Sequence, residues 1–152
     1  MNIEELKELL IESYSEDTCL PGLKKQWSKE NPTLGQCAIT AMAVYDLFGG
    51  KIMRCMVSSG SHYYNIIDDH IVDLTADQFL GEKPLYEEGT ERTREYLLSN
   101  EDTKKRYLIL LKNLLYNKQK KDSIDTEEII NNVIKFGKNF EKYKKMNRGK
   151  YE

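Results

Sequence analysis

Residues 31–79 read NPTLGQCAITAMAVYDLFGGKIMRCMVSSGSHYYNIIDDHIVDLTADQF, and this stretch decides the fold. Its first half contains CAITAMAVYDLF, residues 37–48, in which nearly every residue is apolar. Twelve such residues with three alanines are typical of a helix that is buried on most sides, and they disfavour a buried strand. Asn-Pro-Thr at residues 31–33 supplies start signals, and Gly49-Gly50 supplies a stop. The sequence therefore predicts a buried helix at 37–48.

Three runs rich in β-branched, aromatic and methionine residues follow this helix, at 51–58, 62–67 and 71–75. Ser-Ser-Gly-Ser and Asp-Asp separate them, and both are turn sequences. Short strands joined by such tight connections form an antiparallel meander, which needs an apolar partner on one face. We therefore expect an α+β fold in which the helix in the N-terminal half packs on a small antiparallel sheet.

The chain before this stretch predicts one amphipathic helix and one loop. Apolar residues recur at helical spacing from Ile3 to Tyr14, with glutamates in the first turns. Pro21-Gly22 then marks a loop that leads to Trp27. We expect Trp27 to anchor this loop in the core, and stacking on a substrate is the alternative.

The chain beyond Phe79 passes through Gly81, Pro84 and Gly89, which predicts a surface loop. A helix is expected at 103–117, an exposed connection at the NKQKKDS segment, and a last helix from about Asp125. That helix should bury Ile129, Ile130, Val133, Ile134, Phe140 and Tyr143. We expect one α+β domain over residues 1–117 and a helical extension over 118–152 that docks on it; a helix for dimerisation or a partner is the alternative.

Composition excludes several classes of protein. Lysine and arginine number 23 against 25 acidic residues, so the net charge of −2 gives no general attraction to nucleic acid or anionic membranes, although the segment after Leu115 is rich in lysine. No run approaches the ~18 apolar residues of a membrane span, and the acidic start does not suit a signal peptide. We expect a cytoplasmic protein, monomeric or homodimeric, that uses no cofactor.

Cysteine usage fits a reducing compartment. The three cysteines, Cys19, Cys37 and Cys55, are odd in number and lack a CxxC pair, which disfavours a disulfide framework and a structural zinc site. Cys37 alone stands at a helix start, where backbone N–H groups and a nearby imidazolium activate a thiol. Gly35 just before it would permit close approach of a substrate. The alternative is that Cys37, like the other two, is a small buried hydrophobe.

His62 and Asp73 can be related through strand register. If Asp68-Asp69 form a two-residue hairpin turn, Tyr64 faces Asp73, and Asp73 becomes the diagonal neighbour of His62 on the same face. A slip of one residue would send Asp73 to the other face. An aspartate bonded to one imidazole nitrogen leaves the other for a thiol. The alternative is a purely structural histidine and a carboxylate that closes a strand end.

Several of these segments carry a family resemblance. WSKENPTLGQCAITA, FGGKIMRC and SHYYNIIDDHIVDLTADQF resemble the YunG-like family of small uncharacterised bacterial proteins, as do SEDT and RTREYLLSNEDTKKRY. The resemblance covers about three quarters of the chain and ends near Asn117. It brings no established activity with it.

A more distant resemblance has chemical content. A GxC sequence on a helix, SHYYN on a strand and VDLT on the next is similar to the papain-like and transglutaminase-like superfamily. The resemblance implies that Cys37 is the nucleophile, His62 the base and Asp73 the residue that orients it. Papain-like enzymes usually carry a glutamine upstream of the nucleophile as oxyanion donor. The candidates here are Asn31, at the matching distance, and Gln36, next to the cysteine.

Three functions follow as expectations. The first is a thiol-dependent hydrolase or acyltransferase acting on an unknown peptide, amide or acyl substrate. Tyr63, Tyr64 and Asn65 would line or buttress its cleft, and the candidate substrate-binding residues are Trp27, Tyr64 and Asn65. The second is a non-catalytic binding module that retains the fold. The third, and the weakest, is a metal site built from Cys37, His62 and Asp73, which metal analysis of the purified protein would test.

Overall fold

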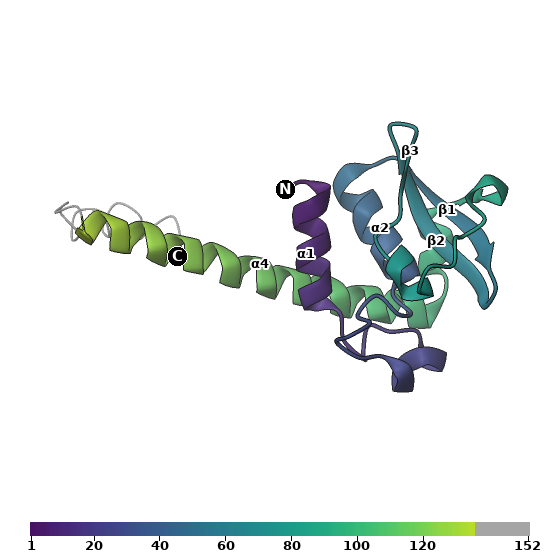
Figure 1. Cartoon of the computed structure of the whole chain (residues 1–152), viewed down its shortest axis with the longest axis horizontal. Coiled ribbons are helices and arrows are strands. Elements are labelled where there is room, and N and C mark those ends of the chain that lie inside the picture. The colour runs from purple at the N-terminus through teal and green to yellow at the C-terminus, as the bar shows by residue number, and fades with distance from the viewer. Residues whose placement is uncertain (136–152) are drawn as a thin grey trace. The chain divides into compact units, whose positions relative to one another are not determined.

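The computed structural model describes residues 1–135, with residues 123–130 and 132–135 described by their backbone alone. Within it, four antiparallel strands form one sheet: β1 (Lys51–Val57), β2 (Gly60–Ile67), β3 (His70–Val72) and β4 (Thr90–Arg92). Their order across the sheet is β3-β2-β1-β4, so the first three strands form the predicted meander (Figure 1). The α+β class is confirmed.

The predicted hairpin turn and register are confirmed as well. Asp68 and Asp69 both have positive φ, 49° and 63°, as the two-residue turns that suit strand twist require. Ile67 pairs with His70 and Asn65 pairs with Val72. The next position after β3 is Asp73, which therefore lies on the face that carries Tyr64 and His62.

The buried helix α2 (Cys37–Phe48) has the predicted bounds and packs against β2 and β1. Its core residues Ile39, Met42 and Val44 have no exposed surface. The first helix, α1 (Ile3–Ser13), begins with a capping box between Asn2 and Glu5 and contributes leucines to the same core cluster. The two helices are tied by a hydrogen bond of 2.6 Å between the Tyr14 and Thr40 hydroxyls.

Two adjacent glycines join α2 to β1, and they allow a matched test of the connection. Gly49 and Gly50 both have positive φ, 76° and 78°. A Cβ at Gly50 would collide with the Ile66 carbonyl oxygen, whereas a Cβ at Gly49 would meet no atom. We expect Gly50→Ala to lower the free energy of unfolding by about 2–4 kcal/mol, because it adds a backbone collision to the strain of positive φ. Chemical denaturation of Gly49→Ala isolates the strain, and equal losses for both variants would refute the collision.

The region beyond Phe79 is more ordered than the sequence predicts. It contains β4, which extends the sheet along β1, and the short helix α3 (Arg94–Leu98). β4 has only three residues, and its sequence Thr-Glu-Arg has no apolar alternation, so no strand pattern could be seen. Thr93 caps α3 through its side chain.

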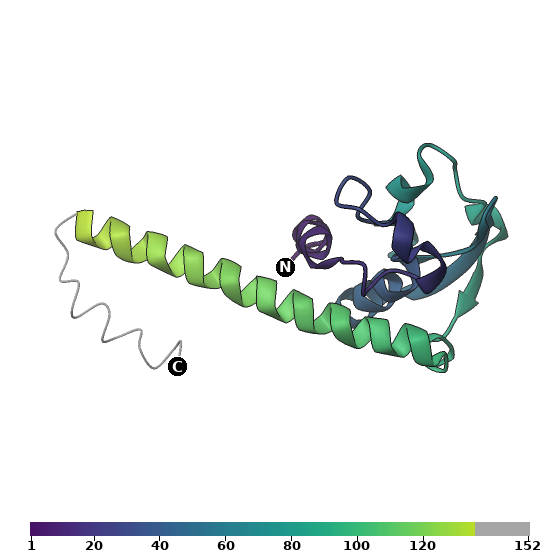
Figure 2. The same ribbon diagram turned by 90° about the horizontal axis from the view of Figure 1, so that it is seen from below.

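The predicted break in the C-terminal part is wrong. One helix, α4 (Glu101–Lys135), runs through the NKQKKDS segment without interruption (Figure 2). That segment has no glycine or proline, its lysines and glutamine favour helices, and Lys118 pairs with Asp122 one turn later at 3.1 Å. No helix among the described residues is long and apolar enough to cross a membrane.

The chain divides into two compact units, residues 1–114 and 115–152. Docking of the C-terminal extension on the domain stays a prediction. The side chains expected to be buried there lie outside those that the structure describes: Ile129, Ile130, Val133, Ile134, Phe140 and Tyr143.

Candidate functional site

Cys37 is the first residue of α2 and the one half-buried cysteine, since Cys19 and Cys55 are both buried. The chain enters the helix through Gly35, whose φ is +71°. A Cβ at Gly35 would lie 2.6 Å from the Cys19 sulfur, so only glycine fits this turn. Within the described residues no side chain caps the helix, which leaves its first N–H groups for another acceptor.

His62 and Asp73 form the contact that the register predicted. The distance between His62 Nε2 and Asp73 Oδ2 is 2.6 Å, and both side chains are buried. The other carboxylate oxygen accepts from the Thr75 amide at 3.2 Å and from its hydroxyl at 3.4 Å. Asp73 is therefore held from both ends, and it fixes the orientation of the imidazole.

The remaining ring nitrogen, His62 Nδ1, is the one that a thiol would use, because Nε2 is bonded to Asp73. Burial opposes protonation of His62, but the Asp73 hydrogen bond and the Cys37 thiol outweigh it and raise the pKa of the imidazole to about 9. Nδ1 itself makes no hydrogen bond of acceptable geometry with any described residue. The Cys37 thiol is near enough to raise the pKa of His62, but it forms no hydrogen bond with Nδ1 in this structure.

Two aromatic residues that the sequence analysis missed complete the cluster. The Tyr86 hydroxyl donates to Asp73 Oδ2 at 2.7 Å, and the Phe79 ring meets the imidazole edge-on with centroids 4.6 Å apart. Burial, and then the contact with the Asp73 carboxylate, raise the pKa of Tyr86, so its phenol stays protonated and donates. No local pattern marks Tyr86, because it lies in a segment that the sequence assigns to a loop.

The oxyanion candidates lie in different settings. Gln36 has no exposed surface, and in the orientation that satisfies its amide, the nitrogen donates to Thr18 while the oxygen accepts from Thr18 and Cys19. Its donors are already in use, which leaves no N–H for an oxyanion. Asn31 lies in the preceding turn, where its backbone bonds to Ser28 and Leu34, and its predicted role stays a prediction.

The residues predicted to line or buttress the cleft are structural supports. Trp27 packs against the core and donates through its indole to the Pro32 carbonyl at 2.9 Å, as expected of a loop anchor. Tyr64 and Asn65 are each 2% exposed. Their polar groups bond to backbone carbonyls, Tyr64 to Tyr86 at 3.1 Å and Asn65 to Ala41 at 2.9 Å. Of the two predicted roles, their burial fits buttressing.

The described residues also bear on the predicted metal site at Cys37, His62 and Asp73. Among the residues that the structure describes, no group of three histidine, cysteine or acidic side chains is arranged to hold a metal ion.

These observations define an α+β protein in which a helix-borne cysteine, a strand histidine and an aspartate form one cluster. The chain belongs to the YunG family, whose model matches residues 2–119. It is 31% identical over 100 residues to the uncharacterised protein YunG of Bacillus subtilis (strain 168), covering 66% of this chain and 83% of that protein. No solved structure matches the chain. The match ends within α4, close to the limit that the resemblance predicted.

Proposed function

We propose that this protein is a thiol-dependent hydrolase or acyltransferase with Cys37 as nucleophile, His62 as its acid and base, and Asp73 as the residue that orients the imidazole. The observation that supports this most is that the two nitrogens of the His62 ring differ in their contacts. Nε2 is bonded to Asp73 at 2.6 Å, whereas Nδ1 has no hydrogen-bond partner among the described residues, and the Cys37 thiol contributes to the raised pKa of the ring. A helix-borne cysteine beside a strand histidine also supports a papain-like or transglutaminase-like core.

The proposed reaction needs no further group. With a pKa of about 9, His62 is protonated at neutral pH, so it can act as the acid in the proposed reaction. The sulfur attacks an acyl carbon, and the C–S bond forms. His62 Nδ1 gives its proton to the leaving amine or alcohol as the bond between the acyl carbon and that group breaks. Water or an amine then attacks the thioester, returns a proton to Nδ1 and releases the sulfur.

Backbone N–H groups are the best oxyanion donors. The first turn of α2 starts at the nucleophile itself, and no described side chain caps it. Its N–H groups carry the positive end of the helix dipole, so they suit the negative charge that develops on the acyl oxygen. This assignment replaces Gln36, whose amide is engaged elsewhere.

Comparative alkylation of the three cysteines tests the proposal. Burial raises the pKa of Cys19, and burial together with Asp73 raises that of Cys55 to about 11. We expect iodoacetamide at pH 7 to modify Cys37 at least about tenfold faster than either, as followed by peptide mass spectrometry. Comparable slow modification of all three would refute an activated nucleophile.

One observation favours a non-catalytic alternative. His62 has no exposed surface, because Phe79 packs against its ring, and a base without access to a substrate is a structural group. In that case the protein is a binding module whose His62–Asp73–Tyr86 network specifies the fold. The two functions differ in the alkylation experiment, since only the enzyme requires a fast Cys37.

A further inference from the structure

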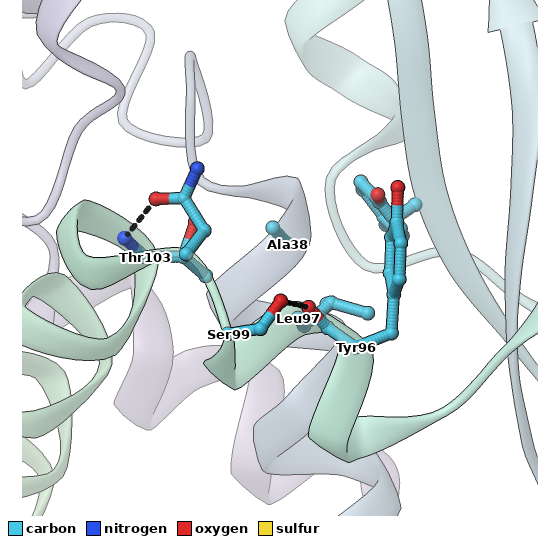
Figure 3. Close-up of a pocket in the computed structure, with 7 residues that line it drawn as sticks. Ala38, Tyr96, Leu97, Ser99 and Thr103 are labelled. Carbon is cyan, nitrogen blue, oxygen red and sulfur yellow. Dashed lines mark hydrogen bonds between the residues drawn. The ribbon is translucent and has the colours of Figure 1, made fainter.

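A pocket of about 310 Å³ opens beside the start of α2, the helix that begins with Cys37. It lies between the start of α2, strand β2 and the segment that joins α3 to α4, and it is lined by Ala38, Tyr63, Tyr96, Leu97, Ser99, Asn100 and Thr103. Figure 3 shows Ala38 between Tyr96 on one side and Thr103 on the other, with Ser99 and Leu97 below. This volume is at the lower end of the range for small-molecule sites, so it suits one part of a substrate.

One lining residue connects the pocket to the proposed nucleophile, because Ala38 follows Cys37 in the first turn of α2. Tyr63 follows His62 in β2, so its side chain lies on the face of the sheet opposite to the imidazole. Cys37 and His62 do not line the pocket themselves. Burial is the main cause that raises the pKa of Tyr63, and Cys37 adds to it, so the thiol lies within electrostatic range of this phenol. A ligand in the pocket would therefore lie close to Cys37, on the face of β2 opposite to the imidazole.

The sheet beside the pocket carries two arginines, Arg54 and Arg92, and Arg92 donates hydrogen bonds to the Thr90 hydroxyl at 2.9 Å and the Glu91 carbonyl at 3.0 Å. Arg54 is the cross-strand partner of Tyr63, and both Arg54 and Arg92 lie on the face that carries Tyr63. The Arg92 guanidinium lies 5.6 Å from the centroid of the Tyr96 ring. Neither arginine forms an ion pair within the part of the chain that the structure describes, in contrast to Arg94, which pairs with Asp46 at 2.7 Å.

Two half-buried guanidinium groups on one face repel each other unless an anion lies between or near them. Two carboxylates, Glu91 and Glu95, line a second pocket together with Arg92. Glu91 points to the opposite face of β4, and neither carboxylate forms an ion pair with Arg92 among the described residues. The polar lining is uncharged and includes donors. Asn100, for example, accepts the Thr103 amide at 3.0 Å through its oxygen, which leaves its nitrogen to donate.

We propose that this pocket, with Arg54 and Arg92 at its side, binds an anionic group of the substrate, a carboxylate or a phosphate, and so presents the adjacent acyl carbon to Cys37. The inference rests on the proposed function, and it narrows the substrate to an acidic acyl compound. Guanidinium groups bind both anions through paired N–H donors, so the chemistry is shared between them.

A comparison of iodoacetate with iodoacetamide distinguishes an anion site from the general reactivity of the thiol, because both reagents alkylate the same sulfur but only iodoacetate is negatively charged. For each variant we compare the ratio of the two alkylation rates at Cys37. We expect Arg54→Gln and Arg92→Gln each to lower the iodoacetate to iodoacetamide ratio at least about threefold, since each removes a nearby positive charge. The ratio cancels any change in the reactivity of the sulfur that both reagents share, so it reports only the effect of the reagent's charge.

Lys51→Gln is the matched control. It removes the same charge from the same strand, but Lys51 is exposed and lies on the face opposite to Arg54. Its ratio should equal that of the unmodified protein. Equal ratios for the control and both arginine variants would overturn the anion site and leave a fast Cys37 untouched.

The change in melting temperature on adding an anion reports binding at the pocket, and it does not depend on the reactivity of the Cys37 thiol. Inorganic phosphate and succinate, each at constant ionic strength, should raise the melting temperature of the unmodified protein and of Lys51→Gln but not of Arg54→Gln. A shift with succinate alone identifies a carboxylate ligand, and a shift with phosphate alone identifies a phosphate ester. A slow Cys37 with an intact arginine-dependent shift would refute the enzyme and keep the anion site, whereas no shift with either anion would overturn the site.

Discussion

Replacing His62 with glutamine is expected to lower the rate at which iodoacetamide modifies Cys37 at pH 7 by about tenfold to a hundredfold. In the proposed enzyme the His62 imidazolium favours the thiolate of Cys37, and a neutral amide cannot replace it. Glutamine can still donate to Asp73, so the buried carboxylate keeps a partner and the fold should survive. Rates measured by peptide mass spectrometry report Cys37 separately from Cys19 and Cys55.

His70→Gln is the matched control, because His70 is the other histidine of the chain and is exposed at the start of β3. The same chemical change there should leave the Cys37 rate within twofold. If His62→Gln also leaves it unchanged while the circular dichroism spectrum is native, the imidazole does not activate the thiol.

Stability should fall as the pH rises from 6.5 to 9. The pKa of His62 is about 9 in the folded protein against an ordinary 6.5, so folding favours the imidazolium. Its contribution is complete below pH 6.5 and is lost as the pH passes through 9, a total of about 3 kcal/mol as an upper estimate for a fully buried group. For a chain of this length, melting temperatures should drop by about 6–12 °C across the window.

Asp73→Asn isolates the cause of this pH dependence. The Asp73 hydrogen bond is the largest influence that raises the His62 pKa, and without the carboxylate, burial alone would lower it. The variant should therefore be less stable at pH 6.5 but show a flat or reversed dependence up to pH 9. A slope equal to that of the unmodified protein would show that other groups produce it.

The features that could be predicted from the sequence depend on local patterns. The bounds of α2 follow from a continuous apolar run between a start signal and two glycines, and the structure has the same bounds. The contact between His62 and Asp73 follows from one turn, because Asp68 and Asp69 set the register of everything after them. In both cases a few neighbouring residues determine the local structure, and the Asp68-Asp69 turn thereby also determines a contact between residues that are farther apart in the chain.

The features that could not be predicted depend on tertiary contacts without a local signal. Tyr86 reaches Asp73 only because its segment lies along the end of β1, where the Leu85 amide donates to the Met56 carbonyl. β4 is defined by the strand it pairs with, not by its own three residues. The continuity of α4 differs from the predicted break at the NKQKKDS segment. A charged segment is typical of an exposed connection, but lysine, glutamate and glutamine also favour helices.

The distance between Cys37 Sγ and His62 Nδ1 in a crystal structure of the protein is the most direct test of the central claim. A single reactive cluster requires these atoms within about 4 Å of each other, with Asp73 still bonded to Nε2. A ring that turns Nδ1 away from the sulfur, or a thiol that points into the core, would contradict the enzyme and leave a small binding protein.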